Sequence, residues 1–85
     1  MELKEMAKIT KELRKLGKNN PQLLLKKLKK MELSELELII LKSRYIDGLL
    51  FKQIPDVIGK SESWMYKVHK RAILRVVECS LSLVF

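Results

Sequence analysis

The sequence predicts a small all-α protein, folded as one bundle of about five helices. Apolar residues recur at three- and four-residue steps along most of the chain, which is the period of a helix buried on one side. Only three glycines and two prolines interrupt the 85 residues, and 47% of the residues are hydrophobic. This balance is typical of a folded helical chain, and its length suits a single domain, residues 1–85, better than two.

The net charge of +8 is distributed unevenly along the chain. Residues 1–31 hold ten basic and three acidic side chains, residues 32–59 hold three and five, and residues 60–85 hold five and two. Two basic segments on either side of a neutral one suit a polyanionic partner such as nucleic acid. Well-solvated lysine-rich helices without such a partner would have the same composition, so charge alone leaves both interpretations open.

The basic segment 1–31 is expected to form a pair of helices. Residues 2–16 carry an apolar stripe, and Gly17 is suited to the left-handed conformation that ends a helix. Asn20 is expected to cap the second helix, with Pro21 in its first turn, where the missing N–H costs nothing. The apolar stripe of this second helix consists of Leu23, Leu24, Leu28 and Met31.

A third helix is expected from about Glu35 to about Ile46. Ser34 and Glu37 have the spacing of a capping box, and Asp47-Gly48 is a turn that ends the helix. This helix is apolar on more than one side, with a main stripe of Leu36, Ile40, Leu41 and Tyr45 that is widened by Leu38, Ile39 and Ile46. The wider side needs a cover, for which the N-terminal helical pair and a second copy of the chain are both candidates.

Residues 48–72 have the spacing of a helix-turn-helix. A short helix is expected over about residues 51–58, followed by a turn at Gly59-Lys60. Pro55 removes a backbone donor near the start of this helix. If the helix begins instead at Ile54, Pro55 lies in the first turn and its cost falls.

A long helix is expected after the turn, capped by Ser61 and reaching at least Val77. Its inward residues are Met65, Val68 and Ala72, which face Ile54 and Ile58 of the short helix. In a helix-turn-helix, the outward side of the second helix enters the major groove of DNA. The residues expected to contact DNA are Lys60, Ser61, Glu62, Ser63, Tyr66, Lys67, Lys70 and Arg71.

Residues 35–77, about half of the chain, resemble the fourth conserved region of bacterial sigma factors, and they are similar to small sigma-like regulators encoded by phages of Gram-positive bacteria. The resemblance implies promoter binding by the helix that follows Ser61 and, in sigma factors themselves, contact with RNA polymerase. Nothing before Glu32 resembles the other promoter-reading regions, so a complete sigma factor is not expected. The matching residues are Ile40-Leu41, Arg44-Tyr45, Gly48-Leu49, Ile54, Ile58-Gly59, Ser61 and Lys70-Arg71-Ala72-Ile73.

Three residues depart from the sigma pattern and favour an alternative function. Pro55 stands where a small helical residue is usual, Lys60 stands where an apolar one is usual, and Trp64 lies among positions that are commonly polar. The alternative is a protein-interaction module with the same fold, which binds a transcription regulator, RNA polymerase or a second copy of the chain. The residues expected at such an interface are Trp64, Leu38, Ile39, Leu83 and Phe85. Trp64 has two other interpretations, which are packing against the sugar-phosphate backbone of DNA and core packing that fills a gap against the N-terminal helices.

Other function classes lack the residues that they require. His69 and Cys79 are the sole histidine and cysteine, too few for a metal site or a catalytic set, so we expect no metal, no cofactor and no enzymatic activity. His69 is expected to be partly buried on the last helix, and Cys79 to be a small buried residue.

No run of about 18 apolar residues predicts a membrane span, and residues 1–17 lack the apolar stretch of a secretion signal, so the protein is expected in the cytoplasm. Basic helices lying on a membrane surface are the weaker interpretation of residues 1–31, which lack Trp and Phe. The apolar tail, residues 78–85, is expected to pack on another part of the protein.

Overall fold

The computed structural model describes residues 2–82, with side chains described for residues 4–79. The described chain is all-α and contains no strand, which confirms the predicted helical bundle. A π-helical segment η1 (Lys42–Ile46) extends the third helix, and a 3-10 turn η2 (Phe51–Gln53) precedes the fourth. The α-helices are α1 (Glu2–Asn19), α2 (Pro21–Lys30), α3 (Glu35–Leu41), α4 (Ile54–Ile58) and α5 (Glu62–Ser82).

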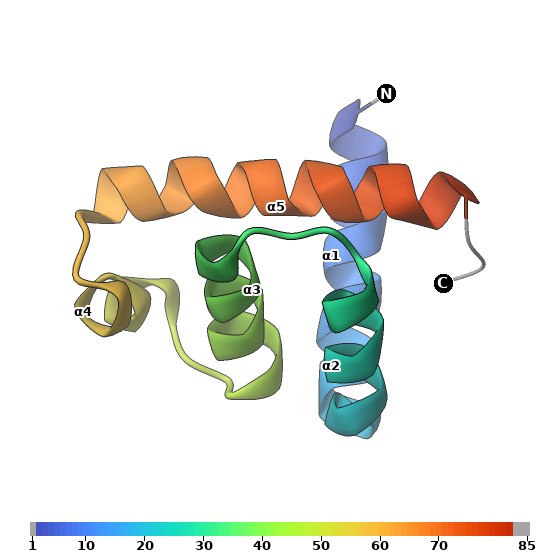
Figure 1. The fold of residues 1–85 in the computed structure, drawn as a ribbon, viewed down its shortest axis with the longest axis horizontal. Helices are drawn as coiled ribbons and strands as arrows, with labels where there is room; N and C mark the ends of the chain where they lie inside the picture. Colours follow the sequence, from blue (N-terminus) through green and yellow to red (C-terminus); the bar gives the residue numbers. More distant parts are fainter. Residues whose placement is uncertain (1, 83–85) are drawn as a thin grey trace.

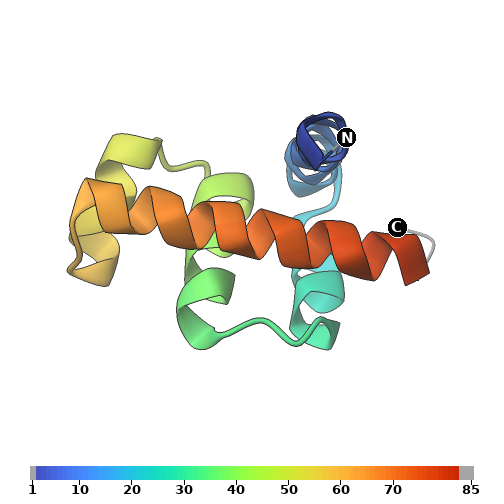
Figure 2. The same ribbon diagram turned by 90° about the horizontal axis from the view of Figure 1, so that it is seen from above.

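Helix α5 runs along the whole length of the molecule and touches most of the other helices (Figure 1). Helix α1 crosses it steeply near its C-terminal half with α2 antiparallel to α1 below α5, α3 lies beneath its middle, and α4 lies at its N-terminal end. Figure 2 shows the same order from above, with α5 lying across the other helices. The two halves of α5 therefore meet different partners.

Side-chain caps begin α2 and α3 at the residues that the sequence indicates. The Asn20 side chain accepts a hydrogen bond from the Leu23 N–H (3.2 Å), and Pro21 occupies the first turn of α2. Ser34 Oγ accepts from the Glu37 N–H (3.2 Å), and Glu37 Oε1 accepts from the Ser34 N–H (2.8 Å). Both predicted caps are thus confirmed.

The turn before α5 also follows its sequence signals. Helix α4 begins at Ile54, so Pro55 lies in the first turn, and the later of the two starts considered for this helix is correct. Gly59 ends α4 in the left-handed conformation, with φ of 66°. Ser61 Oγ then accepts a hydrogen bond from the Trp64 N–H (3.2 Å) at the start of α5.

Gly17 does not end the first helix, contrary to the prediction. Helix α1 continues to Asn19, and Gly17 is buried within it against the backbone of Tyr45. A Cβ atom at residue 17 would overlap the carbonyl group of Tyr45. The glycine is therefore required by the close approach of α1 to η1, and not by a left-handed backbone conformation.

The third helix covers the predicted range but changes its winding. After Leu41 the backbone widens into η1, where the N–H of Asp47 reaches the carbonyl of Lys42 at 2.9 Å, five residues back. Gly48 follows with φ of 76°. The helical pattern in the sequence gave no signal for this change from α to π.

A buried carboxylate fastens the start of α3 to α5. Glu37 is only 1% exposed, and its Oε2 lies 3.1 Å from Nε of Arg75 in an ion pair. Arg75 Nη1 also donates a hydrogen bond to the Glu32 carbonyl (3.4 Å), in the loop before α3. Glu37 thus serves both the capping box and the contact with α5, and the sequence indicated only the first role.

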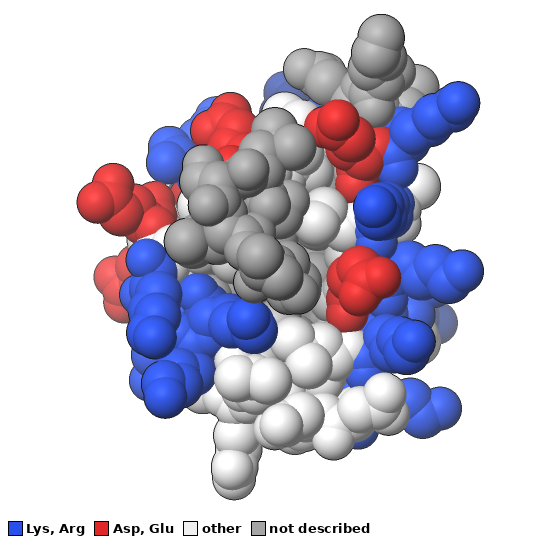
Figure 3. Space-filling view, turned by 90° about the vertical axis from the view of Figure 1, so that its right-hand side faces the viewer, with Lys and Arg blue, Asp and Glu red and all other residues white. Residues whose placement is uncertain are grey.

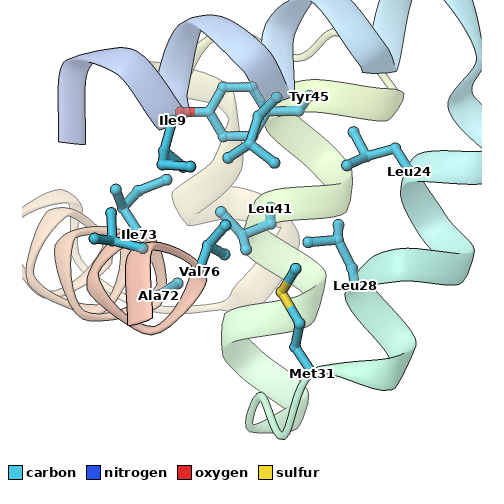
Figure 4. Close-up of a cluster of buried hydrophobic side chains, with 11 residues drawn as sticks. Ile9, Leu24, Leu28, Met31, Leu41, Tyr45, Ala72, Ile73 and Val76 are labelled. Carbon is cyan, nitrogen blue, oxygen red and sulfur yellow. The ribbon is translucent and has the colours of Figure 1, made fainter. Parts of the chain in front are cut away.

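Two clusters of buried apolar side chains hold the helices together. The larger, shown in Figure 4, joins α1, α2, the third helix and the C-terminal half of α5. The smaller joins α3, α4 and the N-terminal half of α5, through Ile40, Ile54, Met65 and Val68. The larger cluster consists of Ile9, Leu13, Leu24, Leu28, Met31, Leu41, Tyr45, Ala72, Ile73, Val76 and Val77.

The larger cluster also covers the wide apolar side of the third helix. Leu38 and Ile46 pack against it. The N-terminal helical pair therefore covers this side of the third helix, and a second copy of the chain is not needed for it. Leu23, in contrast, is 39% exposed and lies outside the buried stripe of α2, contrary to the prediction. Helix α5 continues to Ser82, so residues 78–82 are helical and do not form a separate tail.

Gly17→Ala should lower the free energy of unfolding by about 1–3 kcal/mol, because the new methyl group overlaps backbone atoms and pushes α1 away from η1. Helix propensity alone would stabilise this variant by about 1 kcal/mol, so the sign of the change identifies the cause. Urea denaturation measures it. Lys18→Ala, at the neighbouring exposed position, is the control and should change stability by less than about 0.5 kcal/mol. An alanine variant as stable as the parent would contradict the steric role of Gly17.

Candidate nucleic-acid interface

The N-terminal half of α5 has one buried side and one exposed side. Met65 and Val68 are buried with Ile54 of α4, and Ala72 continues the buried stripe one turn later. Because this stripe repeats at three- and four-residue steps, the opposite side of the helix faces solvent. All eight residues predicted to contact DNA are exposed, namely Lys60, Ser61, Glu62, Ser63, Tyr66, Lys67, Lys70 and Arg71.

The outward side of α5 is positively charged. Four of the eight residues are basic, counting Lys60 in the turn before α5, and one, Glu62, is acidic. Among the side chains that the structure describes, none of these four cations forms an ion pair with a carboxylate. Their charges are therefore available to an anion that approaches from solvent.

Trp64 packs against the smaller cluster. Its side chain is half-buried there, so the indole packs on α3 and α4 and not on the N-terminal helices, where the core-packing interpretation placed it. The ammonium group of Lys60 lies 5.5 Å from the centroid of the indole ring, within range of a cation–π contact. The indole thus joins the turn to α5 and presents only part of its surface to a partner.

A cluster of aromatic rings supports the outward side of α5 from behind. The centroid of the Phe51 ring lies 5.3 Å from that of Tyr66 and 4.9 Å from that of His69, which it meets edge-on. The Arg44 guanidinium lies 4.4 Å from the Phe51 centroid and donates a hydrogen bond to the Leu49 carbonyl (3.0 Å). The segment between the third helix and α4 is thereby fastened to α5, with Tyr66 at the exposed edge.

Tyr45 and His69 form the polar contact at the centre of the molecule. The Tyr45 hydroxyl and His69 Nε2 share a hydrogen bond of 2.9 Å. Burial lowers the pKa of His69 to about 4, with the nearby Arg44 charge acting in the same direction. Burial also raises the pKa of Tyr45, against the opposing effects of Arg44 and Arg14. Both groups are therefore neutral at pH 7, and His69 is a half-buried helix residue, as expected.

Sequence reasoning did not identify Phe51 or Arg44 as supports of this site. Arg44 entered only through the family resemblance, and Phe51 was read as the start of a helix. The ring partners of Phe51, Tyr66 and His69, are more than a dozen residues away along the chain, and Arg44 reaches this site through Phe51. No local pattern marks such a contact.

The residues expected at a protein interface are mostly not free. Leu38 packs against the larger cluster, and Ile39 is half-buried. Leu83 and Phe85 lie outside the described residues. The large apolar side chains that are exposed near the turn are instead Leu50 and Val57, which are 50% and 57% exposed.

A second basic surface lies on the N-terminal helical pair. Viewed from the end of the molecule that these helices form, basic side chains gather along both edges of the face, with uncharged side chains between them in its lower part (Figure 3). A shallow hollow between α1 and η1 is lined by three cations, Arg14, Lys18 and Arg44, and by no carboxylate. Most of the positive charge of the protein is therefore outside the helix-turn-helix segment.

Cys79 is half-buried against the larger cluster. Among the side chains of residues 4–79, no three His, Cys, Asp or Glu groups gather closely enough to hold a metal ion. None of the helices within residues 2–82 has the length and apolar character needed to cross a bilayer. Comparisons with models of protein families, with curated proteins and with solved structures give no match.

A shift from pH 7 to pH 5 should destabilise the protein by about 2 kcal/mol through His69 alone. The pKa of His69 is about 4 in the folded protein and 6.5 in the unfolded chain, so the unfolded chain binds the extra proton in this window. The stability that the neutral His69 contributes is fully present above pH 6.5, and it is lost as the pH falls from 6.5 towards 4. Urea denaturation at the two pH values measures the loss, and His69→Gln, which cannot titrate, should reduce it by the same amount. An equal loss in both proteins would contradict the burial of a neutral His69.

Proposed function

We propose that this protein is a DNA-binding regulator of transcription, in which α4, the turn at Gly59 and α5 act as a helix-turn-helix. The observation that carries the proposal is the division of α5 at residues 62–71. One side is buried against α3 and α4, and the other is exposed, polar and basic. An α-helix presented in this way fits the major groove of DNA.

In this arrangement the exposed residues divide into two groups. Ser63 and Tyr66 lie on the first two turns of α5, where polar side chains reach base edges in the major groove. Lys67 and Lys70 follow on the same side and neutralise phosphates, which sets affinity and orientation more than sequence preference. The ring cluster of Phe51, His69 and Tyr66 supports the base-reading end of α5.

The role in transcription comes from the resemblance to sigma region 4 and to the regulators of phages and mobile elements. The protein acts by binding and not by catalysis, and its site of action is the cytoplasm, where bacterial DNA is found. The partner of a helix-turn-helix protein that regulates transcription in this way is a promoter duplex.

Lys67→Ala combined with Lys70→Ala should weaken binding to a labelled promoter duplex at least tenfold in 0.1 M salt. Each lost phosphate contact should also reduce the slope of log affinity against log salt by about 0.9. Fluorescence anisotropy over a salt series measures both quantities. Lys26→Ala combined with Lys29→Ala on α2 removes the same charge as a control and should have a smaller effect. Absence of binding by the parent protein at low salt, or unchanged binding by the α5 variant, would overturn the proposal.

A second candidate function is self-association through α4, which is favoured by the exposure of Leu50 and Val57. Leu50 and Val57 belong to the same short segment around η2 and α4, and contiguous exposed apolar surface often marks a protein contact. Helix-turn-helix proteins commonly bind DNA as dimers, in which two recognition helices meet successive major grooves. A second copy of the chain is therefore the partner that fits both candidate functions, ahead of RNA polymerase or another transcription protein.

Sedimentation velocity at about 1–100 μM protein tests this second function. The parent chain should form dimers as its concentration rises, and Val57→Asp should remain monomeric because a charge at this exposed position opposes the apolar contact. The variant should keep the helical circular dichroism of the parent, since Val57 lies outside both clusters. A parent chain that is monomeric over the whole range would contradict self-association.

A further inference from the structure

We propose that a stripe of lysines on α1 is a second contact with duplex DNA, which binds the phosphate backbone without regard to sequence. The inference deepens the proposed function and rests on it for the identity of the polyanion. It concerns a surface separate from α5, on a helix that lies outside the segment resembling sigma region 4. Its members, which we call the α1 lysine stripe, are Lys4, Lys8, Lys11, Lys15 and Lys18.

The spacing of the α1 lysine stripe keeps its members on one side of the helix. The lysines follow one another at alternating four- and three-residue steps, the same period as the buried residues Ile9 and Leu13 on the opposite side. All five are exposed. At 1.5 Å per residue, the stripe extends for about 21 Å. This length matches several successive phosphates of a duplex.

Nearby acidic residues offset the α1 lysine stripe only in part: Glu5 lies three residues before Lys8, and Glu12 lies three residues before Lys15. None of its members pairs with a carboxylate among the described side chains. Like charges at three- and four-residue spacing each destabilise a helix by about 0.2–0.5 kcal/mol. Glu5 and Glu12 offset part of this repulsion, and a bound polyanion relieves the part that remains.

One end of the α1 lysine stripe adjoins a concave basic site. Lys18 lines the hollow between α1 and η1, together with Arg14 and Arg44. The position of Arg44 is fixed by the Leu49 carbonyl and the Phe51 ring, so little freedom remains to be lost when an anion binds. A phosphate group of the backbone suits a hollow that three cations and no acidic side chain surround.

The chemistry of the α1 lysine stripe favours a phosphate backbone over other anionic partners. Lysine is depleted at the centres of protein interfaces, where aromatic and apolar anchors supply most of the energy, and the stripe has neither. Surface-bound membrane helices need an apolar side that faces the bilayer, but the apolar side of α1 is buried in the larger cluster. Flexible ammonium groups in a row match a regular line of phosphates that needs no base reading.

The stripe adds to the contact of α5 and does not duplicate it. Helix α1 crosses α5 steeply, and its N-terminal end lies beside α5 while its C-terminal end lies far from it (Figure 1). The stripe therefore begins beside the C-terminal half of α5, apart from residues 60–71 that are proposed to contact DNA, and leads away from α5. DNA that contacts both helices touches two different sides of the protein.

The test compares two triple variants that remove the same charge. Lys8→Gln with Lys11→Gln and Lys15→Gln alters the α1 lysine stripe, and the matched control alters α2 at Lys26, Lys29 and Lys30. Glutamine keeps a high helix propensity, and circular dichroism melts confirm that both variants fold. Binding to a labelled duplex of arbitrary sequence is measured by anisotropy over a salt series. The α1 variant should bind at least tenfold more weakly in 0.1 M salt, with the salt slope reduced by about 0.9 per lost contact.

Three other results would contradict the inference or its assignment to DNA. An equal effect in the α2 control shows that only total charge matters, and an unchanged α1 variant shows that the stripe does not touch DNA; either result overturns the inference. A competition experiment adds poly-glutamate to the bound duplex at equal charge concentration. If poly-glutamate displaces the duplex from the parent protein but not from the α1 variant, the stripe prefers an acidic protein, and the assignment to DNA is overturned. The α5 variant of Lys67 and Lys70 tests the proposed function separately, because it leaves the α1 lysine stripe intact.

Discussion

The close approach of α1 to the backbone of Tyr45 is the constraint on which the rest of the structure depends. It requires a residue without a side chain at position 17, and it brings the Tyr45 ring between α1 and α5, where the hydroxyl reaches His69. The N-terminal helical pair can then cover the wide apolar side of the third helix. Without this approach, that side would be exposed and α5 would lose the partners of its C-terminal half.

The arrangement separates support from recognition along a single helix. The C-terminal half of α5 is buried in the larger cluster, and the N-terminal half presents a basic side to solvent. Arg44 and Phe51 connect the two regions, because they join the end of the third helix to the exposed edge of α5. In the proposed function, this division lets one helix both hold the bundle together and read DNA.

Local signals in the sequence were sufficient for the helices, their caps and the exposed side of α5. Ser34, Asn20 and Ser61 act through neighbours three residues away, so their roles can be read from short spacings. Gly17 was misread because glycine serves both helix ends and close helix approaches, and only the fold distinguishes them. The Glu37–Arg75 ion pair and the contacts of Phe51 join residues that are distant in sequence, and the π-helical winding of η1 depends on packing. None of these features has a local signature.

The unequal size of the two clusters has a consequence for motion. Among the described side chains, the buried cluster at the end of α5 that meets α1 and α2 has eleven members, including those of α5, whereas the cluster at the end that meets α4 has four. Local stability follows the amount of apolar surface buried, so it falls along α5 towards its N-terminus. The first turns of α5, which carry the proposed DNA-reading side chains, and α4 therefore have a lower local stability than the C-terminal half of α5. Small adjustments of α4 and the first turns of α5 to the shape of a groove cost little there, while the scaffold at the other end stays rigid.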